Sequence, residues 1–215
     1  MDRFSSSEKI SDENRAPKDR LAVTIARVSV SLMFFANGCA FATWASRIPF
    51  VQQNLSLTPS ILGFALLMMG LGALAAMQVV AKLIAKFGSN RVTSIACVVM
   101  AAALVSVAYA RNVFELGAAL FLFGIVSGGM DVAMNANAVA VERRVGKSVM
   151  ASFHALWSLG SMAGALVGSA FAVAAYPLTF HFTVVGCMIA VFGLIGHQCL
   201  ITDQVLEDVE NKGEN

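Results

Sequence analysis

The residues with the clearest chemical potential are polar side chains deep inside apolar stretches. Asp131 lies 11 residues before the next charged residue, Glu142, and at 1.5 Å per helical residue this is a depth of about 16 Å. That depth is about half of the roughly 30 Å hydrocarbon core of a bilayer. A carboxylate there costs several kcal/mol unless it is paired, hydrated or protonated. Asp131 is therefore a candidate proton- or substrate-coupling group, or else a carboxylate that clamps a neighbouring helix.

Three further polar residues accompany this carboxylate. Asn135 follows Asp131 by four residues and shares its helix face. Asn37 lies ten residues before Arg47 and so reaches a similar depth from the opposite side. His154 can titrate near neutral pH, although it lies only seven residues after a lysine, which also fits an interfacial hydrogen-bonding role. We expect the four to line a polar pathway; for Asn37 the alternative is an interhelical hydrogen bond.

The composition indicates that these residues belong to a membrane protein. The 215-residue chain is 58% hydrophobic and 13% charged, whereas soluble domains are about 25% charged and at most about half apolar. Too few polar residues are present to coat a globule of this size. This excludes an ordinary cytosolic enzyme, a disordered chain and a nucleic-acid binder with a basic surface. We therefore expect a lipid bilayer as the surroundings and no nucleic-acid partner.

Charge-free stretches divide the chain into six candidate transmembrane helices. Each crossing needs about 20 apolar residues. The 55 residues from Ser148 to Thr202 contain no charged side chain and provide two crossings, separated at Tyr176–Pro177. The sequence therefore predicts an all-α membrane domain over residues 21–202, with helices over residues 21–46, 59–81, 92–110, 113–141, 149–175 and 179–202.

The basic residues predict the orientation in the membrane. Thirteen of the 15 lysines and arginines fall on the side of the two termini, and only two fall on the other side. The excess of basic residues marks the cytoplasmic side. We therefore expect both termini to lie in the cytoplasm. Residues 1–20 read as a disordered tail and residues 203–215 as an acidic tail, because neither contains an apolar stretch.

Small residues inside the stretches predict close helix packing. A glycine at every fourth position lets two helix backbones approach each other. The four cysteines all lie in apolar stretches without a C-x-x-C pair, so we interpret them as packing residues rather than metal ligands or a disulfide framework. The packing glycines of the fifth stretch are Gly160, Gly164 and Gly168.

Three segments together resemble the major facilitator superfamily, with the bacterial inner-membrane YbjJ-like proteins as the most similar subgroup. They read FFANGCAFATWASRIPFVQQNL (Phe34–Leu55), GGMDVAMNANAVAVE (Gly128–Glu142) and SFHALWSLGSMAGALVG (Ser152–Gly168). The resemblance implies an N-terminal six-helix half made of two inverted three-helix units. It also implies transport of a small solute by alternating access, coupled to protons, with the four polar residues in the transport pathway.

The superfamily's cytoplasmic loop motif, G-x-L-x-D-R-x-G-R-R, is partly present between the second and third stretches. Leu83 and Gly88 match it, and Lys86 keeps the charge of the first arginine. Arg91 stands one place later than the closing arginines, and Ala85 replaces the aspartate. The resemblance implies a gating loop containing Lys86, Gly88 and Arg91, in which the family's acidic partner is missing.

A single six-helix half would leave the surface that faces the pathway uncovered. The substrate pathway in this family runs between two halves, so a lone half would expose polar groups to lipid. We expect the chain to pair with a second six-helix half or with a second copy of itself. The alternative is a truncated product or a membrane subunit that does not transport. The sequence leaves the substrate open, since sugars, amphiphilic drugs and organic acids are all compatible with it.

We expect no enzyme activity and no metal or cofactor. The enzymatic alternative is an intramembrane serine protease, with Ser127 as nucleophile and His181 or His197 as base. Such an enzyme needs a G-x-S-G pattern, but Gly124 precedes Ser127 by three residues instead of two. No histidine is present in the second stretch to stabilise an oxyanion.

Overall fold

The protein is a bundle of six helices in the part of the chain that the structure describes. The structure is a computed structural model, which describes the backbone of residues 3–197 and 200 and the side chains of residues 21–196 and 200. All six helices are long and apolar enough to cross a membrane, α1 through its segment Leu21–Asn54. The predicted all-α membrane fold is confirmed. The helices are α1 (Arg3–Asn54), α2 (Pro59–Phe87), α3 (Ser89–Val107), α4 (Val113–Val145), α5 (Met150–Val173) and α6 (Leu178–His197).

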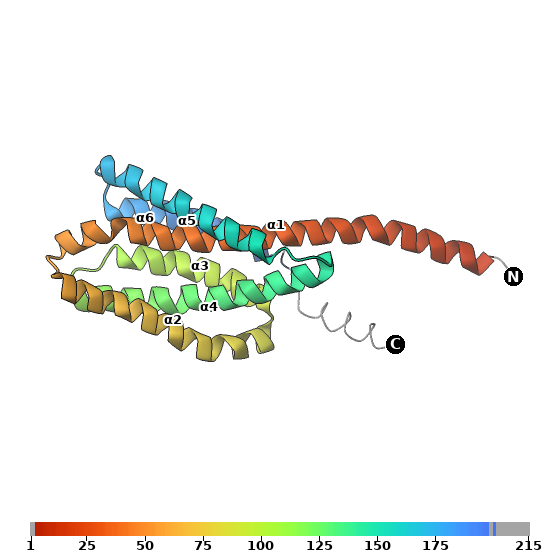
Figure 1. Cartoon of the computed structure of the whole chain (residues 1–215), viewed down its shortest axis with the longest axis horizontal. Helices are drawn as coiled ribbons and strands as arrows, with labels where there is room; N and C mark the ends of the chain where they lie inside the picture. Colours follow the sequence, from red (N-terminus) through yellow and green to blue (C-terminus); the bar gives the residue numbers. More distant parts are fainter. Residues whose placement is uncertain (1–2, 198–199, 201–215) are drawn as a thin grey trace.

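Several helices extend beyond the apolar stretches that predicted them. Helix α1 starts at Arg3, inside the stretch expected to be a disordered tail, and it projects well beyond the bundle (Figure 1). Helices α2 and α3 are separated by Gly88 alone, where a ten-residue loop was expected. Lysine, leucine and alanine are good helix formers, so a helix can continue after its residues leave the hydrocarbon. The expected acidic tail at residues 203–215 lies outside the described residues.

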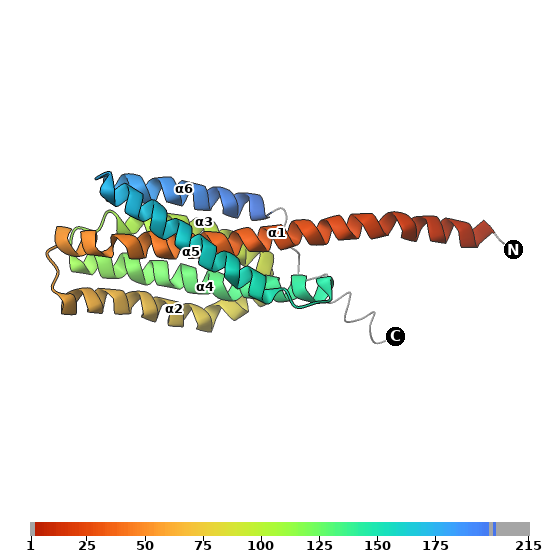
Figure 2. The ribbon, with the colours of Figure 1, turned by 45° about the horizontal axis from the view of Figure 1, so that its top comes forward.

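Two helix pairs form the framework of the bundle. Helix α1 packs most extensively on α5, and α2 packs most extensively on α4. Helix α3 contacts α4 and α6, and the two ribbon views place α2 on the opposite side of α1 from α6 (Figures 1 and 2). Exchanging α1 with α4 and α2 with α5 turns the first pair into the second. This pattern is the one expected for two inverted three-helix units.

Glycines allow the backbones of the first pair, α1 and α5, to touch. A Cβ atom added to Gly160 would collide with the carbonyl oxygen of Phe35, and one on Gly164 with that of Cys39. A Cβ atom on Gly168 would collide with the hydroxyl of Ser46. The stripe over residues 160–168 therefore lies directly against α1, and no larger side chain fits there without moving a backbone.

Glycines also allow the backbones of α2 and α4 to touch. A Cβ atom on Gly124 would collide with the carbonyl oxygen of Met69, and one on Gly72 with that of Phe121. Gly128 lies against Ala73, with 2.9 Å between the added Cβ and the alanine Cα. Both pairs are therefore held by direct backbone contact.

A carboxylate at the end of α4 sets the start of α5. Glu142 Oε2 accepts hydrogen bonds from the backbone N–H groups of Val149 at 2.7 Å and Met150 at 2.8 Å. These donors would otherwise lack partners in the first turn of a helix. The bonds turn the chain back sharply after Gly146, which has a left-handed φ of 69°. As a result α5 starts beside the last turn of α4 and returns along the bundle.

For orientation, we call the end of the bundle that carries the α1–α2, α3–α4 and α5–α6 connections the outer end. The opposite end, where α1 projects, is called the inner end (Figure 1).

Candidate transport site

The structure places Asn37 inside the bundle, at a junction of four helices. Its side chain is 6% exposed. Its amide oxygen accepts a hydrogen bond from Trp157 Nε1 on α5 at 3.0 Å. Its amide nitrogen donates to the backbone carbonyl of Ser127 on α4 at 3.4 Å and lies 3.8 Å from the sulfur of Met100 on α3. The side chain therefore links helices, which is the alternative that the sequence left open for it.

Asp131 and Asn135 lie next to this junction, on an outward face of α4. Asp131 is exposed and Asn135 is half-buried. The amide nitrogen of Asn135 donates to the backbone carbonyl of Asp131 at 2.8 Å and to its carboxylate Oδ1 at 3.3 Å. Asn135 thus restrains the carboxylate from one helical turn away and leaves its second oxygen free of this bond.

His154 of α5 joins the same face. Its side chain is exposed, and it is close enough to Asp131 for the two to interact electrostatically. The ring of the fully buried Phe34 meets the His154 ring edge-on, with 5.3 Å between centroids. His154 lies one turn from Trp157, as Asp131 lies one turn from Ser127. The two titratable groups are therefore held at a similar level by the Asn37 junction.

The candidate site thus contains three of the four predicted residues on one face and the fourth behind them. Asp131, Asn135 and His154 come together from α4 and α5, while Asn37 connects those helices from within the bundle. Trp157 on α5 is the donor that completes this junction. The signal that could have revealed it is its spacing of three residues from His154, one turn along the same helix.

A basic groove lies at the inner end of the bundle, between α1, the end of α4 and α5. It has a volume of about 930 Å³, and its charged lining residues are Arg27, Arg144 and Lys147. All three side chains are exposed. The groove therefore offers an open, positively charged surface on the side where the sequence places the cytoplasm.

The predicted gating loop is a compact joint rather than an extended loop. Gly88 has a left-handed φ of 84°, and its N–H donates to the carbonyl of Ile84 at 2.8 Å. Lys86 is exposed in the last turn of α2, with its ammonium 5.2 Å from the centre of the Phe87 ring. Arg91 is exposed in the first turn of α3. Only glycine adopts this backbone conformation without strain, so Gly88 forms the turn between the two helices.

The residues of the enzymatic alternative lie at different depths. Counted from the outer ends of their helices, Ser127 is 14 residues along α4 and His181 is three residues along α6. This difference corresponds to about 16 Å, which is beyond hydrogen-bond reach. The side chain of His197 lies outside the described residues.

Comparison with known proteins shows the family. The family model described as Major Facilitator Superfamily matches residues 30–211. The chain belongs to the major facilitator superfamily. It is therefore an integral membrane protein of a transporter family, as its six apolar helices indicate independently.

Proteins with similar sequences occur in several bacteria. An uncharacterized transporter, y4wD, of Sinorhizobium fredii (strain NBRC 101917 / NGR234) is 37% identical over 167 residues, which cover 78% of this chain and 44% of the relative. An uncharacterized MFS-type transporter of Yersinia pestis is 37% identical over 139 residues, covering 65% of this chain and 36% of the relative. The membrane protein MosC of Rhizobium meliloti is 35% identical over 148 residues, covering 69% and 35%. The chain spans less than half the length of these relatives.

Proposed function

We propose that the chain is one six-helix half of a major facilitator transporter and moves a small solute by alternating access, coupled to protons. One observation carries the proposal: a carboxylate, Asp131, is exposed midway along a transmembrane helix, beside His154. A charged group at this depth is stable only beside water or a partner. A watery pathway against a second half supplies both.

In this proposal each polar residue has a distinct task. Asp131 takes up and releases the coupling proton, and Asn135 restrains its carboxylate through the bond at 3.3 Å. His154 lies on the same face and interacts electrostatically with the carboxylate. Asn37 is a positioning residue, because its bonds to α4 and α5 hold Asp131 and His154 at one level.

The close-packed helix pairs support a rocking movement of the whole half. Backbone contact at glycines makes the α1–α5 and α2–α4 pairs rigid, and alternating access proceeds largely by rigid-body rocking of one bundle against another. The compact joint at Gly88, with Lys86 and Arg91 beside it, is proposed as the inner contact that engages or releases during this movement.

The partner in this movement is a second six-helix half or a second copy of the chain. The exposed face with Asp131 and His154 needs a cover, because lipid cannot solvate it. The fact that the chain spans less than half of its relatives is consistent with a missing second half. The mass of the purified full chain in detergent, measured by light scattering, distinguishes a monomer from a dimer.

The proton-binding role of Asp131 can be tested without knowing the substrate. A hydrophobic carbodiimide modifies protonated carboxyl groups in apolar surroundings, so membranes containing the full chain should be labelled at Asp131. The Asp131→Asn variant should lose this label. Glu115→Gln, which removes a carboxylate at the outer end of the same helix, should keep it. Labelling that is unchanged in Asp131→Asn would refute the assignment.

Transport is tested with vesicles that contain the full chain and a pH-sensitive dye. Sugars, organic acids and amphiphilic drugs are added in turn, and a solute-dependent proton flux is expected for one class. Asp131→Asn should abolish the flux while the amount of protein in the membrane is unchanged, and Glu115→Gln should retain it. A monomeric mass without flux for any class would favour the alternative of a non-transporting membrane subunit.

Orientation is tested separately. If the protein lies in the inner membrane of a bacterium with both termini in the cytoplasm, a reporter that is active only in the cytoplasm should be active when it is fused at residue 1 or at residue 215. A reporter after Arg111 should behave in the opposite way.

A further inference from the structure

The outer end of the bundle contains a buried cation that has no acidic partner among the residues that the structure describes. The position of Arg47 near the end of an apolar stretch fits a side chain that snorkels to the interface, but the side chain is only 2% exposed. Its Nη2 donates to the backbone carbonyl of Tyr176 at 3.1 Å, and its guanidinium carbon lies 4.8 Å from the centre of the Phe50 ring. Its Nε and Nη1 have no hydrogen-bond partner among the described residues. The bond to Tyr176 fastens the α5–α6 connection to α1 but neutralises no charge.

His181 lies close to this guanidinium and is also buried. Its side chain is fully buried, stacked on Phe171 at 4.5 Å between ring centroids and flanked edge-on by Phe182 at 5.3 Å. Neither ring nitrogen has a partner within the described part of the chain. The ring is close enough to Arg47 to interact with it electrostatically. Full burial and the two flanking aromatic rings separate the His181 ring from bulk water.

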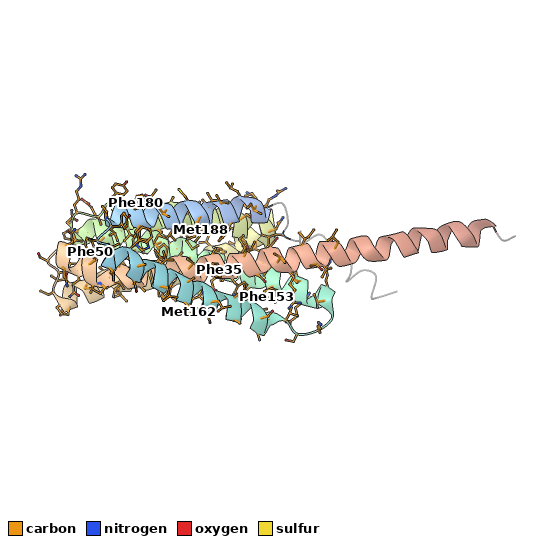
Figure 3. The ribbon with its side chains drawn as sticks, turned by 90° about the horizontal axis from the view of Figure 1, so that it is seen from above. Phe35, Phe50, Phe153, Met162, Phe180 and Met188 are labelled. Carbon is orange, nitrogen blue, oxygen red and sulfur yellow. The ribbon has the colours of Figure 1, made fainter. Side chains whose placement is uncertain are left out.

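A third donor lies one helical turn before Arg47. The side chain of Trp44 is 1% exposed, and its Nε1 has no hydrogen-bond partner in the described residues. A Cβ atom on Gly168 would lie 3.4 Å from Cε1 of His181 and would collide with Ser46, so α1, α5 and α6 converge at this level. Figure 3 labels Phe50 and Phe180 at this same end of the bundle.

The chemistry of these groups selects the kind of ligand. Each unpaired buried donor destabilises the folded state, and an unpaired buried charge destabilises it more. Water would satisfy donors without neutralising the guanidinium. A carboxylate from a second half is too large to enter, because Arg47, Trp44 and His181 are already enclosed by the helices of this chain, with 2% exposure at most. A monoatomic anion is smaller than a carboxylate side chain and supplies the missing charge.

We propose that Arg47, Trp44 and His181 form a binding site for a small anion of the halide class. Chloride is the halide available to most cells. The bound ion would neutralise Arg47 and strengthen the outer contact between α1 and the α5–α6 connection. The site is distinct from the exposed face with Asp131, and it does not depend on the proposed transport function.

Tryptophan fluorescence offers a direct test, because the chain contains only two tryptophans, Trp44 and Trp157. Iodide is a halide and quenches tryptophan on contact. In the full-length Trp157→Phe variant, whose folding is first checked by gel filtration, iodide should quench Trp44 along a saturating curve. Chloride at constant ionic strength should reverse the quenching, and caesium, a cationic quencher, should have little effect. A second measurement on the unmodified chain should show a higher unfolding temperature in chloride than in gluconate.

Substitutions at the two outer arginines complete the test. Arg47→Gln should abolish saturable quenching, whereas Arg111→Gln, which removes a charge from an exposed outer position, should leave it unchanged. If Arg47→Gln does not fold, Arg47→Lys keeps the charge but loses the planar donors and should raise the half-saturating iodide concentration about tenfold. Quenching that rises linearly without saturation, ignores chloride or persists in Arg47→Gln would show that only water occupies the cluster.

Discussion

The α1–α5 and α2–α4 pairs use the same backbone contact but differ in their polar links. In both pairs a glycine meets a carbonyl oxygen of the partner helix, Gly160 with Phe35 in one and Gly124 with Met69 in the other. Only α1–α5 carries direct side-chain bonds across the contact, from Trp157 to Asn37 at 3.0 Å and from Ser161 Oγ to the carbonyl of Gly38 at 3.3 Å. Among the described residues, no side-chain hydrogen bond links α2 directly to α4.

The difference indicates that packing alone holds an inverted-repeat pair together, while hydrogen bonds specify its register. Between membrane helices the lipid supplies no hydrophobic driving force, so close packing provides most of the association. The bonds of Asn37 fix the height of α5, which carries His154, relative to α1 and to α4, which carries Asp131. Within the described part of the chain, no side-chain hydrogen bond fixes the register of the α2–α4 pair in this way.

The largest expected effect comes from filling the glycine contacts, and it should be equal in the two pairs. Gly160→Leu and Gly124→Leu each drive a side chain into a backbone carbonyl, which should cost about 3 kcal/mol or more. Folded yield and thermal unfolding by gel filtration measure the loss. Gly63→Leu is the matched control, because open space surrounds that glycine. A folded Gly124→Leu beside an unfolded Gly160→Leu would mean that the pairs are not equivalent.

The next effect should distinguish the pairs, because it removes a polar link that only α1–α5 has. Asn37→Leu leaves Trp157 Nε1 without its acceptor inside the bundle, which should cost about 1–3 kcal/mol in unfolding free energy. Asn135→Leu is the matched control, since its bonds stay within one helix, and it should cost less than about 0.5 kcal/mol. In a double-mutant cycle with Trp157→Phe, a coupling energy of zero would contradict the importance of this bond.

Much of the fold could be predicted from the sequence because the bilayer imposes simple rules. The intervals between charged residues predict six helices, and the structure confirms six apolar helices in the described residues. Helix ends were harder to predict. The charged stretch around Lys86 remains helical, so a change in polarity does not mark the end of α2. Only Gly88, with its left-handed φ of 84°, interrupts the backbone there.

The candidate site was predictable within a helix and unpredictable between helices. The four-residue spacing of Asp131 and Asn135 predicts a shared face, and the structure gives them a hydrogen bond. The partners of Asn37 depend on the rotation and height of three other helices, which spacing along one helix cannot encode. For the same reason the burial of Arg47 was missed, because a charge near a helix end fits a snorkelling side chain equally well.

A smaller effect concerns how the second helix of each inverted unit begins. Thr58 Oγ1 accepts a bond from the N–H of Ile61 at the start of α2 at 3.3 Å, whereas α5 starts on the carboxylate of Glu142. Glu142→Gln keeps one acceptor but loses the charge, and it should cost about 1 kcal/mol. Thr58→Ala should cost a similar amount or less. Unfolding in membranes measures both, and a neutral Glu142→Gln would mean that the α4–α5 turn is held by other contacts.

The smallest effect should come from the second polar link, Ser161 to Gly38. Hydrogen bonds between membrane helices average about 0.6 kcal/mol, so Ser161→Ala should cost about that amount. Ser158→Ala, which loses a bond to a carbonyl of its own helix at 3.2 Å, should cost less. Ser161→Ala should also fail to restore the stability that Gly38→Ala loses. A Cβ atom at position 38 still collides with the backbone carbonyl of Trp157 when the serine hydroxyl is absent. Rescue in that double variant would show that the hydroxyl, rather than backbone contact, sets the distance between α1 and α5.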